Sequence, residues 1–457
     1  MCAGARSVVA YGMATRHHDF ANTQDPTAAE LIAARPWLAM HAMDGLTLDG
    51  VPLTAIADAL GTPSWVYSAP TMRERFHALA AALARSGLDA HLHYAVKAND
   101  HLAVLGVFAR LGAGADVVSE GELHRALQAG IPGSRIVFSG VGKTGRELAL
   151  ALTHDIAQIN VESAEELALL AEIAATTGRT ARIAFRINPD VDAGTHTKIA
   201  TGRARDKFGV PYADAAALYA HAASLPNIAP VGVAVHIGSQ ILSLSPFRTA
   251  FARVADLVGA LRAAGLSVHN VDCGGGLGIG YRNEPVPGPL GLAGAMAAAF
   301  RGLEVKLILE PGRWLVGAAG LLLASVILTK RTSDGRIVVL DAAMNDLLRP
   351  AMYNAWHGIV PVSPIDVLTS PGPADVVGPV CESGDTFARS RSLPPLAPGA
   401  RVAILDAGAY GAVMSSTYNA RALAAAAMTD RQRWAPIRAR QPIEVLWRDE
   451  LIPEWLA

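Results

Sequence analysis

Cysteine and charge are both scarce in this chain of 457 residues. Its three cysteines, Cys2, Cys273 and Cys381, lie far apart. That spacing offers neither a disulfide framework nor a metal-binding pattern, and it favours a reducing cytoplasm. Charged residues make up 17%, and the formal net charge is -1. We therefore expect a cytoplasmic protein with no metal and no nucleic-acid partner, because nothing here suits a polyanion.

Long apolar runs are also missing. The longest, residues 315–328, is interrupted by glycine and too short to span a bilayer, so we expect a core segment there and no membrane partner. The first twenty residues contain a short apolar patch without a convincing cleavage site, which argues against a secretory signal. We expect residues 1–42 to be an N-terminal extension without a chemical role.

Residues 70–315 show a regular alternation of short β-rich segments with Ala/Leu-rich helical segments. The strand candidates are HLHYAVK, ADVVS, RIVFSG, IAQINV, RIAFRIN, VGVAVHIG, VHNVDCG and KLILEP. Strict alternation predicts an α/β fold of the (β/α)8 TIM-barrel type. An open doubly wound sheet is less well supported, because no glycine fingerprint follows the first strand.

Residues 316–457 have a different texture. GLLLASVILTKR, GRIVVLDA, DVVGPVC and RVAILDAGAY are strand candidates separated by turn-rich segments. They predict a second, mainly β domain at the C-terminal side. We expect residues 43–69 to join it, because PSWVYS at residues 63–68 is a further strand candidate.

The predicted barrel strands end in chemically unusual residues. Lys97 ends the first strand and His236 the sixth, the glycine-rich residues 273–280 follow the seventh, and residues 310–313 (EPGR) follow the eighth. Singly, each could be a solvated charge, a core histidine or a tight turn. Barrel active sites, however, lie at the C-terminal ends of the strands, and phosphate is often bound after strands 7 and 8. Together these residues indicate a site on one rim.

The glycines exclude two nucleotide-binding patterns. No triple in residues 273–280 satisfies G-x-G-x-x-G, and the GKT at residues 142–144 has Val137 where a P-loop requires glycine. What remains is a lysine facing a cradle of backbone amides. Pyridoxal phosphate needs these two features, an amine for its aldehyde and an anion site for its phosphate. We expect burial to lower the pKa of Lys97 and so favour the nucleophilic amine.

Specific motifs support a family resemblance. From about residue 43 onward the chain resembles diaminopimelate decarboxylase, in the alanine-racemase-like class of pyridoxal-phosphate enzymes. The segments that carry the resemblance are YAVKAN, GADVVSEGEL, FSGVGKT, RINPDVDAGTHTKIATG, HIGSQ, GGGLGI, EPGR, MNDLLRPAMY, GPVCESGD, GAY and TYN.

The resemblance implies a role for each matching residue. Lys97 would form the Schiff base, Glu310 would pair with the ring nitrogen, and His236 would stack on the ring. Cys381 would be the catalytic acid that protonates the new carbanion. The remaining cofactor-binding residues would be Asp116, Ser239, Gly274, Gly275, Gly276, Gly312, Arg313 and Tyr410. The substrate-binding residues would be Arg313, Arg349, Tyr353, Glu382 and Tyr410.

Oligomeric state follows from the same resemblance. In the family, Cys381 and Glu382 reach the site from the second subunit, which implies a homodimer with shared active sites. Read alone, Cys381 could be a small buried residue. Its polar neighbours at residues 382–385 favour the acid role instead. Cys273, beside the glycines, is expected to be core.

Related activities remain as alternatives. A decarboxylase of this fold could act on ornithine, lysine or arginine. Arg313 and Arg349 beside Glu382 suit the distal carboxylate and ammonium of diaminopimelate better, because arginines would repel a lone ammonium. A racemase would need a base on each face of the ring. A non-catalytic homologue is disfavoured by the joint presence of Lys97, Glu310 and Cys381.

Overall fold

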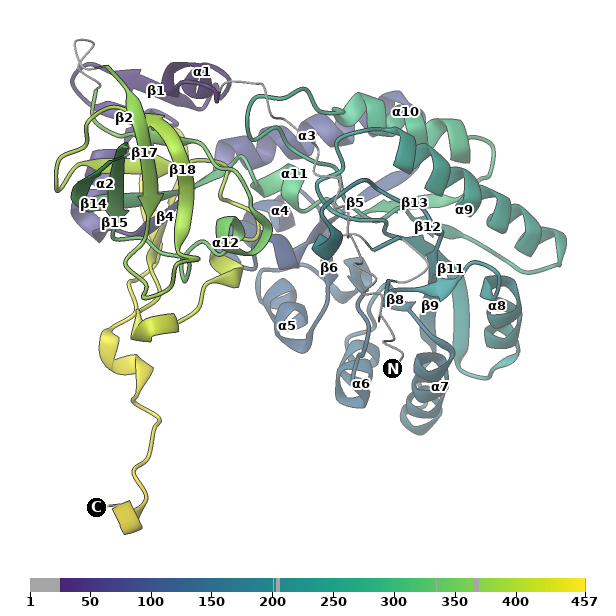
Figure 1. Cartoon of the computed structure of the whole chain (residues 1–457). Coiled ribbons are helices and arrows are strands. Elements are labelled where there is room, and N and C mark those ends of the chain that lie inside the picture. The colour runs from purple at the N-terminus through teal and green to yellow at the C-terminus, as the bar shows by residue number, and fades with distance from the viewer. Residues whose placement is uncertain (1–24, 200, 203–205, 334, 365–369, 457) are drawn as a thin grey trace, which may run out of the picture.

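Eight parallel strands close into a barrel in the computed structural model, which describes residues 25–199, 201–202, 206–333, 335–364 and 370–456 (Figure 1). Strand β13 pairs with β5 and β8 pairs with β9, so the ring has no free edge. The predicted (β/α)8 barrel is confirmed. Its strands are β5 (Ala90–Ala95), β6 (Gly114–Val117), β7 (Ile136–Phe138), β8 (Gln158–Val161), β9 (Ala181–Asn188), β11 (Ile228–Val235), β12 (Asn270–Asp272) and β13 (Lys306–Leu309), and the short β10 (Val210–Pro211) pairs with β9 outside the ring.

Helices surround the strands (Figure 1). They are α3 (Ala69–Arg85), α4 (Leu102–Arg110), α5 (Glu120–Gln128), α6 (Gly145–Thr153), α7 (Ala164–Thr177), α8 (Ala215–Ser224), α9 (Ser245–Ala263) and α10 (Pro289–Phe300). Several begin at hydroxyl N-caps, including Ser119, Thr144 and Ser163, whose side chains accept the first free amides. These caps fix where each strand-to-helix loop ends. Within the described ranges, no helix is long and apolar enough to cross a membrane.

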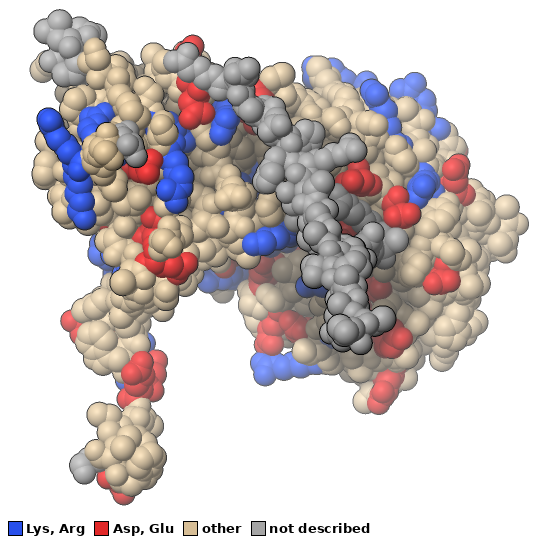
Figure 2. Space-filling model, in the orientation of Figure 1, with Lys and Arg blue, Asp and Glu red and all other residues tan. Residues whose placement is uncertain are grey.

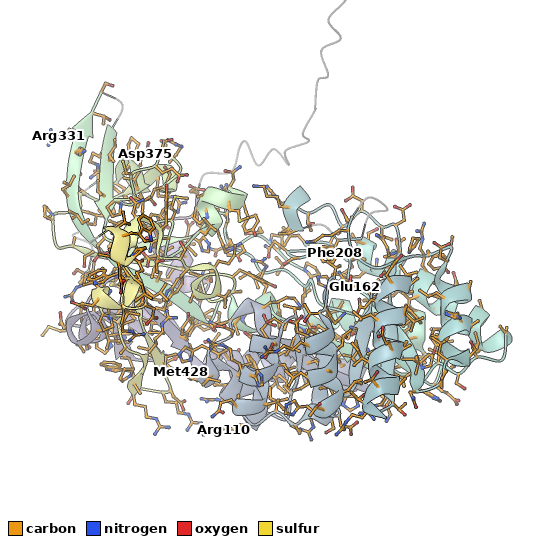
Figure 3. All side chains as sticks on the ribbon, turned by 90° about the horizontal axis from the view of Figure 1, so that it is seen from below. Arg110, Glu162, Phe208, Arg331, Asp375 and Met428 are labelled. Carbon is orange, nitrogen blue, oxygen red and sulfur yellow. The ribbon has the colours of Figure 1, made fainter. Side chains whose placement is uncertain are left out.

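The second lobe is built from antiparallel and mixed strands. It contains β4 (Ser64–Ser68), β14 (Gly320–Thr332), β15 (Gly335–Leu340), β16 (Ile359–Pro361), β17 (Gly372–Val377), β18 (Thr386–Leu393), β19 (Arg401–Ile404), β20 (Ala425–Thr429) and β21 (Trp434–Arg438), with short helices α11 (Arg313–Val316) and α12 (Arg349–Tyr353) beside it. Strand β4 pairs with β14 and β20, as expected for residues 63–68. Strands β16, β18, β20 and β21 were not anticipated. Seen from below, Arg331 and Asp375 lie in this lobe, and Glu162 and Phe208 lie in the barrel (Figure 3).

Residues 25–42, which the sequence predicts to belong to an N-terminal extension, form regular secondary structure. They contain α1 (Ala28–Ala33) and β1 (Leu38–His41), followed by β2 (Gly45–Leu48), β3 (Val51–Pro52) and α2 (Leu53–Leu60). Leu31 and Leu38 are buried in a second apolar core, which they share with residues of β4, β14 and β19. A six-residue helix is too short to show periodicity in the sequence, although its capping box at Thr27 and Glu30 was visible there. Residues 1–24 lie outside the described part of the chain.

A buried ion pair ties this segment to the rest of the molecule. The Arg35 guanidinium binds Asp406 through Nε, which lies 3.1 Å from both carboxylate oxygens, and through Nη2. It also donates to the Tyr281 carbonyl at 3.3 Å. The two ionised side chains are 4% and 1% exposed, so neither has water as an alternative partner.

We predict that Arg35→Ala destabilises the fold strongly, because it leaves the Asp406 carboxylate buried and unpaired. Breaking such a pair typically costs about 3–5 kcal/mol. The matched control is Arg73→Ala, which removes a half-exposed pair with Asp430 whose loss should cost under about 1 kcal/mol. Thermal unfolding of both variants is the measurement. Equal melting temperatures for the two variants would show that Arg35 is not a structural anchor.

Candidate active site

Lys97 lies in a 3-10 turn, Val96–Ala98, immediately after β5, and not in the strand itself. Two contacts hold this turn in place. The Tyr410 amide donates to the Ala98 carbonyl at 2.8 Å, and a Cβ added to Gly312 would lie 2.9 Å from the Ala98 Cβ. Gly312 and Tyr410 therefore pack directly against the turn that contains Lys97.

The Lys97 ammonium forms an ion pair with Asp116. Asp116 lies near the C-terminal end of the neighbouring strand β6 and is fully buried. Our expectation that burial would lower the lysine pKa was wrong. Burial does act in that direction, but the negative charge of Asp116 and its hydrogen bond to the ammonium oppose it, and the pKa of Lys97 is raised above its ordinary value. The cofactor-free chain holds Lys97 as an ammonium.

The glycine-rich loop lies against His236, which follows β11. The Gly275 amide donates to His236 Nδ1 at 3.1 Å, so the ring proton is on Nε2. A Cβ at Gly275 would lie 2.3 Å from the Glu310 carbonyl oxygen, and one at Gly274 would lie 2.3 Å from the Val235 carbonyl oxygen. Gly274 also has a positive φ of 64°. Burial and nearby Arg186 and Lys97 lower the pKa of His236 well below its usual range, so the imidazole is neutral.

Two cavities meet at His236 and Thr201, which line both. The first, of about 340 Å³, contains Lys97 and Glu310. The second, of about 750 Å³, lies toward the β lobe. Besides His236, it gathers five of the predicted residues: Ser239, Arg313, Arg349, Tyr353 and Tyr410. Segments separated by more than two hundred residues thus form one continuous site.

Buried arginines give the larger cavity its chemistry. Arg313 donates to the Tyr281 hydroxyl at 2.8 Å and to the Ser239 hydroxyl at 2.9 Å, and its guanidinium stacks 4.8 Å from the centre of the Tyr410 ring. Arg349 lies 2.7 Å from His357 Nε2. Within the described ranges neither guanidinium has a carboxylate partner, although both residues are at most 6% exposed. Buried cations without anions make this cavity an anion-binding site.

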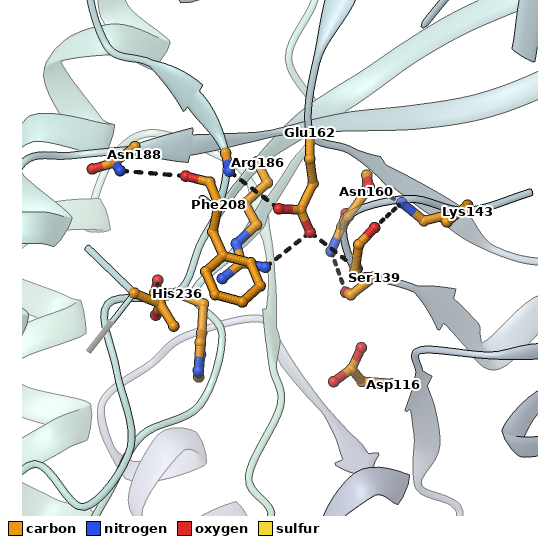
Figure 4. Close-up of polar contacts among 12 residues, drawn as sticks. Asp116, Ser139, Lys143, Asn160, Glu162, Arg186, Asn188, Phe208 and His236 are labelled. Atoms are coloured by element: carbon orange, nitrogen blue, oxygen red, sulfur yellow. Dashed lines mark hydrogen bonds and ion pairs between the residues drawn. The ribbon is translucent and has the colours of Figure 1, made fainter. Parts of the chain in front are cut away.

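The smaller cavity contains residues that the sequence did not single out (Figure 4). Arg186 pairs with Glu162 at 2.9 Å, and its guanidinium lies 4.6 Å from the centre of the Phe208 ring. Glu162 also accepts the amides of Gly140 at 3.0 Å and Gly209 at 3.1 Å, which joins two strand-end loops. The sequence did contain a signal for Arg186. It is a charged residue among the apolar residues of the strand candidate RIAFRIN, as Lys97 is in HLHYAVK.

Cys381 and Glu382 are not brought to either cavity. Both are exposed in the loop after β17, where the Cys381 amide donates to Asn419 Oδ1 at 3.0 Å. Cys273 is buried, as expected for a core residue. The exposed position of Cys381 agrees with our argument that its polar neighbours make apolar burial unlikely.

These residues fit pyridoxal phosphate. Lys97 supplies the amine, and Glu310 supplies a buried carboxyl group in the same cavity. The glycine loop has no room for side chains, so an anion can approach its backbone closely. Arg313 and Ser239 lie beside that loop with their polar groups in the larger cavity. An amine, an acid and a phosphate cradle are the features that this cofactor requires.

Known proteins carry the same sequence pattern. Residues 70–317 match the family described as "Pyridoxal-dependent decarboxylase, pyridoxal binding domain". The diaminopimelate decarboxylase of Zymomonas mobilis is 47% identical over 414 residues, which cover 90% of this chain and 98% of that protein. The enzyme of the same name from Pseudomonas aeruginosa is 45% identical, with the same coverage of both chains.

Solved structures agree with the sequence comparison. Diaminopimelate decarboxylase from Helicobacter pylori, complexed with L-lysine, is 40% identical with a TM-score of 0.83, covering 87% of this chain and 98% of that one. The enzyme from M. jannaschii in co-complex with L-lysine is 36% identical with a TM-score of 0.87, covering 93% and 100%. With this similarity spanning both lobes, the chain belongs to the diaminopimelate decarboxylase family of pyridoxal-dependent decarboxylases.

Proposed function

We propose that the chain decarboxylates meso-2,6-diaminopimelate to L-lysine and carbon dioxide, the last step of lysine biosynthesis, with pyridoxal 5'-phosphate as cofactor. The observation that carries this proposal is the junction of two cavities, one with Lys97 and Glu310 and the other with two buried arginines that lack carboxylate partners in the described chain. The first suits the cofactor's ring and the second suits a substrate with carboxylates at both ends.

Cofactor-binding roles follow from position. Lys97 would hold the aldehyde carbon, His236 would cover one face of the ring, and Glu310 would face the ring nitrogen. The phosphate would lie among Ser239, the backbone of Gly274, Gly275 and Gly276, the loop at Gly312, and Tyr410. When bound, the cofactor's protonated ring delocalises the electron pair left on Cα as carbon dioxide departs. The chain must then deliver one proton to that carbon.

Substrate-binding roles follow from charge. Arg313 lies nearest the phosphate cradle, through Ser239, and Arg349 lies deeper toward His357. The two guanidiniums favour a ligand that brings carboxylate, whereas ornithine has only an ammonium at its distal end. Tyr353 and Tyr410 line the same cavity and would shape it. A decarboxylase for ornithine or arginine is therefore the weaker alternative.

The proton donor and the ammonium-binding residue would come from a second copy of the chain. Cys381 and Glu382 are exposed and line neither cavity of their own chain, so they are free to reach a neighbouring site. We propose a homodimer with shared active sites, in which Cys381 protonates the carbanion and Glu382 binds the distal ammonium. Acidic and basic residues are interspersed on the visible face of the molecule (Figure 2).

We propose the cytoplasm as the compartment, because Cys273 and Cys381 are free thiols.

The first prediction is that Lys97 carries the cofactor. Borohydride reduction of the holoenzyme followed by peptide mapping should place a pyridoxyl label on Lys97. Lys97→Ala should lose both the label and nearly all turnover, because no other amine takes its place at the Asp116 pair. Lys207→Ala is the matched control, since Lys207 lines the same cavity and should keep its label on Lys97. A label on Lys207 in the wild type would contradict the assignment.

The second prediction tests the shared site. Lys97→Ala and Cys381→Ala should each be inactive, and mixing them should restore part of the activity, because a hybrid dimer contains one site with both groups intact. Subunit exchange is verified separately with differently tagged chains. Exchange without recovery would mean that each site is built from a single chain.

The third prediction concerns the distal carboxylate. Arg349→Ala removes a charge-assisted partner worth about 1.5–3 kcal/mol, so kcat/KM for diaminopimelate should fall by roughly ten- to a hundred-fold. Turnover of L-lysine as an alternative substrate should change little, because lysine that reacts at its α-carbon has only an ammonium at its distal end. Glu382→Gln should weaken both ligands, because both have a distal ammonium. An equal loss for both ligands in Arg349→Ala would make the arginine structural.

Substrate choice itself is decided by carbon dioxide release from a panel of diaminopimelate, D- and L-lysine, ornithine and arginine. Diaminopimelate should be the preferred substrate of the wild type. Preference for ornithine would overturn the proposed function.

A further inference from the structure

Three carboxyl groups surround one cation at the floor of the smaller cavity. Lys97 is the cation and forms an ion pair with Asp116. Asp272 and Glu310 remain, at the ends of the adjacent strands β12 and β13, and they are 1% and 6% exposed. Asp272 lies opposite Ile308 in the paired strands, and the Glu310 amide donates to the Gly274 carbonyl at 2.8 Å. At such neighbouring buried positions, ionising both carboxyl groups without a second cation is costly, which favours a retained proton on one of them.

Hydrogen-bond donors decide which one is charged. Asp272 accepts the Gly274 amide at 2.9 Å on one oxygen and the Asn160 side-chain amide at 2.9 Å on the other. In the described chain, the one donor to the Glu310 carboxyl group is the Ser139 hydroxyl, at 3.5 Å. Burial raises the pKa of Asp272 as well, but the N–H donors on its two oxygens oppose that effect, so they favour the proton on Glu310 and the charge on Asp272.

Asn160 is held in the orientation that this arrangement needs. Its side-chain oxygen accepts from Gln158 Nε2 at 2.8 Å, and the Gln158 oxygen accepts from Asn270 Nδ2 at 3.3 Å. Both Asn160 amide hydrogens therefore point the other way, to Asp272 and to the Ser139 hydroxyl at 3.0 Å. Gln158 and Asn160 are 0% and 2% exposed, so water does not compete for these bonds.

The charges around Glu310 act in the same direction. It faces Lys97 and Asp116 from the first two barrel strands, and Asp272 and Cys273 from the seventh. Burial raises the pKa of Glu310 well above its usual range, and the charges of Asp116 and Asp272 add to this, against the opposing effect of Lys97. Cys273 stays neutral, because burial also raises the pKa of its thiol well above the usual value.

We propose that Asp272, oriented by Asn160, is a positioning residue that keeps Glu310 protonated in the cofactor-free chain, so that Glu310 itself supplies the proton of the ring nitrogen. The inference rests on the proposed function, because it requires the cofactor ring to lie at Glu310. The proton balance closes within the site. With the cofactor bound in its unprotonated ring form, the O–H bond of Glu310 would break, an N–H bond would form on the ring, and the Glu310 carboxylate would remain facing the new positive charge. No proton is taken from solvent.

Infrared spectroscopy of the cofactor-free chain tests the protonation state directly. With glutamate labelled by 13C at its side-chain carboxyl, the wild type at neutral pH should show a protonated-carboxyl band that shifts with the label and disappears in Glu310→Gln. In Asp272→Asn that band should also disappear, because the anionic neighbour is gone and an amide hydrogen is offered to Glu310. Asp346→Asn is the control, since Asp346 is an equally buried aspartate in the β lobe that accepts the Ala343 amide at 3.0 Å.

Binding of pyridoxine 5'-phosphate gives a second readout that does not depend on turnover. This probe lacks the aldehyde and reports the ring and phosphate contacts alone. In Asp272→Asn, where Glu310 is ionised, the ring must take its proton from solution. Its affinity relative to wild type should therefore fall about tenfold for each pH unit above the pKa of the ring nitrogen. Titration of the probe's phosphate affects its binding to the wild type and to Asp272→Asn equally, so it cancels in the ratio of the two affinities.

The outcomes separate the two proposals. A wild type without the labelled band, or a pH-independent affinity ratio, overturns the role of Asp272 and leaves the cofactor site intact. A wild type that does not bind the probe overturns the proposed function and this inference together. If Asp272→Asn does not fold, Asn160→Ala replaces it. Loss of the Asn160 donor should move the proton to Asp272, and the protonated-carboxyl band should then no longer shift with glutamate labelling.

Discussion

Closure of the barrel between β13 and β5 is the constraint on which the site depends. These strands are the last and the first of the ring, and they pair in parallel with Leu309 opposite Leu92. Beyond that pair the Ala95 amide donates to the Pro311 carbonyl at 3.3 Å, so the two strand ends stay together as they leave the sheet. Lys97 and Glu310 meet only because this seam is closed. An open sheet would leave them at opposite edges.

The β lobe and the N-terminal segment support the site from outside the barrel. Asp406, held by Arg35, stands four residues before Tyr410 in the loop after β19. Tyr410 itself has a positive φ of 55°, a conformation that costs a non-glycine residue free energy and needs support from its surroundings. The amide contact from Tyr410 to Ala98 and the stacking of Arg313 on its ring provide such support. Packing far from the chemistry therefore sets the position of a residue in the larger cavity.

The sequence alone identified those site residues whose types are unusual at the end of a buried strand. Lys97, His236 and the glycine loop were identifiable because an ammonium, an imidazole or repeated glycine is unusual there. Asn160, Arg186 and Asp272 also lie on barrel strands or at their ends, but deciding which faces the cavity requires the closed ring and its register. The pKa of Lys97 was predicted with the wrong sign for the same reason, since the sequence does not show that Asp116 touches it. Strand β18 was missed because TFARSRSL alternates charge with small residues and has little apolar signal.

The distribution of buried charge orders the whole pocket. Its floor, around Lys97, holds the three acids Asp116, Asp272 and Glu310, whereas its outer cavity holds the two guanidiniums of Arg313 and Arg349. A ligand with a cationic ring at one end and anionic groups at the other fits this gradient in one orientation, because the reverse would place anions against buried carboxylates. His236 lines both cavities and is neutral, so it adds no charge to the acidic floor or to the arginine-lined outer cavity. The chain thus sets the direction of binding by separating its own charges before any ligand arrives.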